Sequence, residues 1–207
     1  MFNMLNNWIN KEYLTEDKIK SLNNLFIKNS PFPNLEMTRF LEKKKLIQLI
    51  KSIAKQPFHP KKSDLFQFSQ TSDLLKVNDK VIQEFVSLLK SKEMVSFMHE
   101  LTGLKLNGKI DLFCSIYQDT DYLLVHDDQL KGRKIAFMFY LSDLNEKDGG
   151  ALALYDNKNK VPYMITKRVL PRLNSFVFFE VSPISFHSVE EVVSNKQRIA
   201  LTGWFHG

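Results

Sequence analysis

The sequence predicts an α+β protein in which a helical first half supports a β-sandwich or barrel. Two observations lead to this prediction. Apolar residues recur at helical spacing through residues 1–105, whereas short strand-like segments separated by turn residues fill residues 106–207. The length of 207 residues suits one domain with a substantial core. We therefore expect a single domain over residues 1–207.

The helical half contains three amphipathic segments. The first follows Thr15, a suitable N-cap, and the second spans residues 41–54. The third begins at Asp79, continues with a further helical turn or two, and ends at Gly103. Between the last two, residues 57–77 are rich in proline and polar side chains, so we expect a functional loop or a partly disordered segment there.

The second half contains seven strand-like segments. Side chains alternate between the two faces of a strand, so Arg198, Ala200, Thr202 and Trp204 should share one face of the last segment. A buried arginine needs an anion, and its planar guanidinium suits a carboxylate held by two hydrogen bonds. The predicted segments are Ile110–Tyr117, Tyr122–His126, Ile135–Leu141, Ala151–Tyr155, Val161–Leu170, Ser175–Val181 and Gln197–Phe205.

Two histidines and one carboxylate are candidates for a metal site. His126 and Asp128 project the same way if residues 122–128 are extended, and His187 occurs much later in the chain. Two histidines and a carboxylate on one side of an ion form the facial triad of non-haem Fe(II) oxygenases, which leaves the opposite positions open. The sequence therefore predicts that these three side chains meet at one iron ion.

Composition narrows the class of protein. The 43% hydrophobic and 25% charged residues are ordinary for a soluble globular protein. The net charge of +6 comes without a dense basic block, so we expect no direct nucleic-acid binding. Cys114 is the only cysteine, which excludes an intramolecular disulfide and a thiolate zinc site. We expect a monomer without a membrane span or signal peptide, cytoplasmic or, in a eukaryote, nuclear.

Several motifs together resemble a known family. His126-x-Asp128, residues 149–155, His187 and Arg198 are similar to the Fe(II)/2-oxoglutarate oxygenases of the prolyl hydroxylase type. One branch matches more closely still, because residues 125–137, 178–187 and 203–207 resemble the ribosomal prolyl 3-hydroxylases. The resemblance covers residues 60–207 well and the N-terminal helices loosely. The eukaryotic members continue beyond the position of Gly207 into a second, non-catalytic β-domain.

The resemblance implies a fold, a reaction and a role for each site residue. The implied fold is a double-stranded β-helix, or jelly-roll, over residues 106–207, and residues 64–68 would fold over the substrate. The implied reaction uses O2 and 2-oxoglutarate, with ascorbate as reductant, to hydroxylate C3 of a proline in the small-subunit ribosomal protein near the decoding centre, and releases succinate. His126, Asp128 and His187 would hold Fe(II), and Arg198, Tyr140 and Tyr117 would bind 2-oxoglutarate.

Two other functions stay open from the sequence. The chain could be a 2-oxoglutarate oxygenase that acts on another protein or on a small molecule, or a non-catalytic jelly-roll interaction module. The long segment 57–77 favours a macromolecular substrate, and the intact triad together with Arg198 argues against a non-catalytic module.

Overall fold

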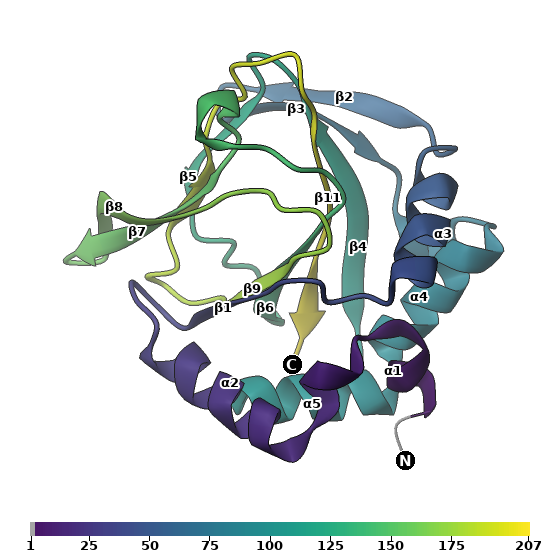
Figure 1. The fold of residues 1–207 in the computed structure, drawn as a ribbon. Coiled ribbons are helices and arrows are strands. Elements are labelled where there is room, and N and C mark those ends of the chain that lie inside the picture. Colours follow the sequence, from purple (N-terminus) through teal and green to yellow (C-terminus); the bar gives the residue numbers. More distant parts are fainter. Residues whose placement is uncertain (1–2) are drawn as a thin grey trace.

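An antiparallel sheet that curls on itself dominates the structure, a computed structural model that describes residues 3–207 (Figure 1). The strands are β1 (Asn34–Met37), β2 (Phe58–Ser63), β3 (Phe66–Thr71), β4 (Ile110–Tyr117), β5 (Tyr122–His126), β6 (Arg133–Tyr140), β7 (Leu152–Lys158), β8 (Val161–Val169), β9 (Phe176–Glu180), β10 (His187–Val189) and β11 (Arg198–His206). They follow the order β1-β9-β6-β11-β4-β3-β5-β10-β7-β8, and β2 pairs with β3.

The three predicted helical segments lie where the sequence places them, with one break, whereas the helix Asn3–Trp8 was not predicted. Asp79 caps the third predicted helix by accepting hydrogen bonds from two backbone N–H groups of its first turn. Ser91 interrupts this helix with an extended backbone, and its hydroxyl caps the next helix by accepting from Met94 N–H. Gly103 ends that helix at φ +74°. The helices are α1 (Asn3–Trp8), α2 (Glu16–Lys28), α3 (Lys43–Ile53), α4 (Lys80–Lys90) and α5 (Lys92–Thr102), with short 3₁₀ helices at Lys11–Leu14, Leu74–Lys76 and Glu146–Asp148.

Alternation along β6 and β11 separates two environments. One face of these central strands packs against the helices and forms the main hydrophobic core, and the other faces the inside of the curled sheet. Residues on the helix-facing side are Ile135, Phe137, Phe139, Leu201 and Phe205. Residues on the inner side are Ala136, Met138, Tyr140, Ala200 and Trp204. The face predicted for Arg198 is therefore the inner one.

Residues 57–77 differ from the prediction of a long loop. They form the β2–β3 hairpin, and β3 enters the sheet by pairing with both β4 and β5. Almost all of β2 is exposed and most of β3 is half-buried, so neither strand has one buried and one exposed face. In the sequence, only the short stretch of residues 66–69 alternates apolar and polar residues, which is a weak signal for a strand. Pro60 is tolerated because β2 is an edge strand.

The two ends of the sheet meet through polar side chains. Lys167 of β8 donates a hydrogen bond to Asn34 Oδ1 of β1 at 2.7 Å, which links the first and last strands of the order. In the order of the sheet, one half is β1-β9-β6-β11-β4-β3 and the other is β5-β10-β7-β8. These halves form the two layers of a jelly-roll, as the sequence resemblance implied. None of the helices within residues 3–207 has the length and apolar character needed to cross a membrane.

Candidate metal centre

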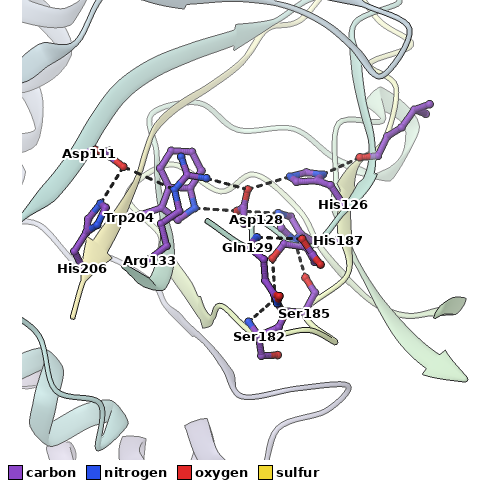
Figure 2. Close-up of polar contacts among 12 residues, drawn as sticks. Asp111, His126, Asp128, Gln129, Arg133, Ser182, Ser185, His187, Trp204 and His206 are labelled. Atoms are coloured by element: carbon purple, nitrogen blue, oxygen red, sulfur yellow. Dashed lines mark hydrogen bonds and ion pairs between the residues drawn. The ribbon is translucent and has the colours of Figure 1, made fainter. Parts of the chain in front are cut away.

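Three side chains converge on the inner face of the sheet (Figure 2). His126 ends β5 and His187 begins β10, and the two residues are direct partners in the pairing of these strands. Asp128 lies between them, with one carboxylate oxygen 3.4 Å from His126 Nε2 and the other 3.3 Å from His187 Nε2. The three ligand atoms lie within 4.8 Å of one another, a spacing that one metal ion can bridge.

Asp128 reaches this point through a turn. Strand β5 ends at His126, and Asp128 has a left-handed backbone with φ +61°. Aspartate tolerates this conformation better than most residues. The extended conformation assumed for residues 122–128 is therefore wrong beyond His126. The neighbouring Asp127 makes a local hydrogen bond by accepting from Gln129 N–H.

Both histidines are held in the tautomer that a metal ion requires. His126 Nδ1 donates to the carbonyl oxygen of Leu124, and His187 Nδ1 donates to that of Ser185, each at 2.8 Å. A carbonyl oxygen can only accept, so the proton stays on Nδ1, and Nε2, which faces Asp128, is the ring atom left to bind a metal ion. Two imidazoles and one carboxylate form a donor set that fits Fe(II).

The electrostatics of the site favour a cation. Burial opposes ionisation of Asp128, but its hydrogen bonds with His126 and His187 hold the pKa of the carboxyl well below its usual range. Burial also lowers the pKa of His126, and the neighbouring Asp128 carboxylate outweighs this effect and raises it. The site thus carries a carboxylate charge at neutral pH.

The triad opens into a cavity of about 130 Å³ that Arg198 also lines. The Arg198 side chain is buried, and it donates from Nε to the Gly150 carbonyl at 3.0 Å and from Nη2 to the Tyr140 hydroxyl at 3.3 Å. Within residues 3–207 the arginine ion pairs involve Arg133 and Arg168, and no carboxylate pairs with Arg198. A buried cation without an anion is unfavourable, so the cavity is suited to an anionic ligand.

Two tyrosines flank this guanidinium. The ring centres of Tyr117 and Tyr140 lie 5.0 and 5.1 Å from Arg198 Cζ. Burial raises the pKa of both hydroxyls, so both stay protonated and can donate. Tyr117 lines the cavity, whereas Tyr140 is fully buried outside the lining and contacts it through Arg198. Phe68 of the unpredicted hairpin stacks on Tyr117 at 4.8 Å between ring centres and lines the cavity.

One contact of the metal centre was not predicted. The alternation along β11 placed Trp204 on the face of Arg198, and this left open whether the indole lines the pocket or packs in the core. In the structure Trp204 lines the cavity and donates from Nε1 to Asp128 Oδ2 at 3.0 Å. His206 lies outside the cavity lining and bonds Asp111 Oδ2 at 3.0 Å. The Trp204–Asp128 bond joins residues far apart in the chain, so it cannot be predicted from a local sequence pattern.

Gly149→Ala is expected to destabilise the protein by about 1–3 kcal/mol, the cost of holding a side chain in a region open only to glycine. Gly149 has φ +71° and ψ −152°, and an added Cβ would overlap the Glu191 carbonyl oxygen. Urea unfolding measures the loss. Gly103→Ala is the control, since Gly103 has φ +74° but open space around it, and should lose only about 1 kcal/mol. Equal losses in both variants would contradict the close approach to Glu191.

Comparison with known proteins agrees with this geometry. The family model described as the 2OG-Fe(II) oxygenase superfamily matches residues 112–206, which include the triad, Arg198 and both tyrosines. A crystal structure of a Pseudomonas putida prolyl-4-hydroxylase superposes with a TM-score of 0.70 at 15% identity, covering 91% of this chain and 98% of that one. At this identity the likeness shows a shared fold.

Two curated relatives share more of the sequence. Prolyl 3-hydroxylase OGFOD1 from Xenopus laevis is 39% identical over 86% of this chain and 35% of its own length. Prolyl 3,4-dihydroxylase OGFOD1 from Ostreococcus tauri is 32% identical over 91% of this chain and 40% of its own length. The chain thus spans less than half the length of these relatives. The fold, the triad and these similarities agree with the match of residues 112–206 to the 2OG-Fe(II) oxygenase superfamily.

Proposed function

We propose that the protein is an Fe(II)- and 2-oxoglutarate-dependent prolyl hydroxylase that modifies C3 of a proline in the small-subunit ribosomal protein near the decoding centre. The observation that carries the catalytic part is the cavity itself, because it joins a metal triad to a buried arginine that no carboxylate of residues 3–207 pairs with. A keto acid with a second carboxylate can bind a metal ion at the triad through one end and Arg198 through the other. The relatives named prolyl 3-hydroxylases support proline as the substrate.

In this proposal the triad binds the metal on one side only. His126 and His187 each supply Nε2 and Asp128 supplies a carboxylate oxygen, so the opposite positions stay free for oxygen ligands. When bound, Fe(II) and 2-oxoglutarate supply the oxidising chemistry with O2 and yield succinate. The histidine tautomers are already set by the carbonyls of Leu124 and Ser185, so metal binding needs no rearrangement of the rings.

Arg198 anchors the cosubstrate in this proposal. Its free guanidinium donors bind the distal carboxylate of 2-oxoglutarate, and the Gly150 carbonyl holds Nε in place. Tyr117 lines the cavity beside this anion and keeps its proton for donation. Tyr140 fixes the guanidinium through its hydroxyl. These residues thereby position the cosubstrate and exclude water from it.

Exposed apolar residues on the β2–β3 hairpin and on β5 support a protein substrate. Leu65 at the tip of the β2–β3 hairpin is 61% exposed, and Leu124 and Val125 of β5 are 47% and 40% exposed. Leu124 N–H donates to the Leu65 carbonyl, so the hairpin tip lies against β5. Leu123, the next residue along β5, lines the cavity. Exposed apolar side chains beside a strand that lines the cavity suit a peptide segment that presents a proline to a monomeric enzyme.

Mass spectrometry of the ribosomal protein tests this function. The protein is incubated with enzyme, Fe(II), ascorbate and 2-oxoglutarate, and we expect one added oxygen on a proline together with succinate. A substrate in which that proline is replaced by alanine is the control. Succinate without hydroxylated ribosomal protein would indicate another substrate. Absence of any Fe(II)-dependent succinate would overturn the proposal and indicate a non-catalytic module.

A further inference from the structure

We propose that Trp204 and Arg133 are positioning residues that orient the Asp128 carboxylate and thereby set the affinity for the metal ion. The inference rests on the proposed metal site. Neither residue is a metal ligand, and Arg133 lies outside the cavity lining. Both act on Asp128 from the side opposite the two histidines, as Figure 2 shows.

The indole makes a directed contact with one carboxylate oxygen. Trp204 Nε1 donates to Asp128 Oδ2 at 3.0 Å, and the Asp128 side chain is only 11% exposed. This bond fixes the rotation of the carboxylate and uses a lone pair of Oδ2. Oδ2 also lies 3.3 Å from His187 Nε2, and Oδ1 lies 3.4 Å from His126 Nε2 and 3.9 Å from Arg133 Nη1. Both oxygens therefore face the histidine nitrogens, in the orientation that the indole bond holds.

Arg133 holds the indole in the plane that this bond needs. Its Cζ lies 3.4 Å from the centre of the Trp204 ring, the shortest such contact within residues 3–207. Arg133 Nε lies 3.8 Å from Asp111 Oδ2, and His206 also bonds that oxygen. A guanidinium that stacks on an aromatic face restrains both groups.

The register of β11 assembles this support. Trp204 pairs with Asp111 on β4 and with Ala136 on β6, and His206 pairs with Arg133. The adjacent strands β4, β11 and β6 therefore bring Asp111, Trp204 and Arg133 together. Because backbone pairing fixes the positions of these residues, the orientation of Asp128 depends on the sheet as well as on the turn that carries it.

Trp204→Phe tests the inference, because it keeps the ring and removes the N–H donor. The probe is Mn(II), and the electron paramagnetic resonance signal of free Mn(II) measures binding without turnover. We expect binding to weaken by about 10- to 100-fold, the usual effect of losing a partner of a metal ligand. Trp8→Phe is the matched control, since Trp8 also has a cation over its ring, Lys45 at 4.7 Å, but is buried in α1. It should bind Mn(II) as the wild type does.

Arg133→Lys provides a second test that keeps the positive charge and removes the planar stack. We expect weaker Mn(II) binding than in the wild type, and no further loss when it is combined with Trp204→Phe, because both act through the same bond. Wild-type affinity in Trp204→Phe would overturn the inference. A wild-type protein that binds no Mn(II) would instead overturn the metal site on which the proposed function rests.

Discussion

Asp128→Ala should abolish turnover and weaken Mn(II) binding by more than about 100-fold. The carboxylate is the only charged ligand of the triad, and both histidine Nε2 atoms face it. Removing one member of a buried charged set costs about 3 kcal/mol or more, which corresponds to at least about 100-fold in affinity. Succinate formation and Mn(II) titration measure the two effects, and His187→Ala should behave alike.

Asp127→Asn is the control for this variant. Asp127 is the neighbouring acid, but it makes only a local bond to Gln129 N–H, which asparagine can replace. Mn(II) affinity and turnover should stay close to those of the wild type. If Asp128→Ala still bound Mn(II) about as tightly as this control, the carboxylate would not be a ligand.

Arg198→Met should raise the dissociation constant for 2-oxoglutarate by about 30-fold or more, because losing one partner of a buried charged pair costs about 2–5 kcal/mol. Methionine has a similar length and no charge. Calorimetric titration of the Mn(II)-loaded protein measures the constant. Arg168→Met is the control, since Arg168 pairs with Glu190 on the surface and should leave the constant unchanged. Equal 2-oxoglutarate affinity in Arg198→Met and the wild type would rule out the assigned role.

Arg198→Met should also affect the stability of the ligand-free protein. Arg198 is a buried cation that no carboxylate neutralises in the described chain, so replacing it removes an unfavourable charge and offsets the two lost hydrogen bonds. We expect the free energy of unfolding of Arg198→Met to be no lower than that of the wild type. Added 2-oxoglutarate should raise the unfolding temperature of the wild type far more than that of the variant.

The elements that the sequence predicted well carry strong local signals. Asp79 and Gly103 act as caps through their own chemistry, and the alternation along the last strand placed Arg198 on the inner face. These features depend on residues a few positions apart, so they are visible before the chain folds.

The parts that were missed depend on distant neighbours. The strands β1 and β10 are only four and three residues long and owe their extension to pairing with β9, β5 and β7. The β2–β3 hairpin lacks a buried face of its own, and the turn at Asp128 depends on its surroundings. The candidate ligands could be identified by residue type and spacing, whereas the Trp204–Asp128 bond depends on the register between β11 and its neighbours.

The central place of β11 also constrains how the protein matures. This strand lies between β6 and β4, both of which the ribosome makes earlier, so the two strands stay separated until residues 198–206 have emerged. Pairings between such distant segments form slowly, because the intervening chain must first be ordered. Neither the anion-binding guanidinium nor the indole that steadies Asp128 can take its place before then. A nascent chain is thus expected to bind metal more weakly, and 2-oxoglutarate not at all, until β11 has paired with its neighbours.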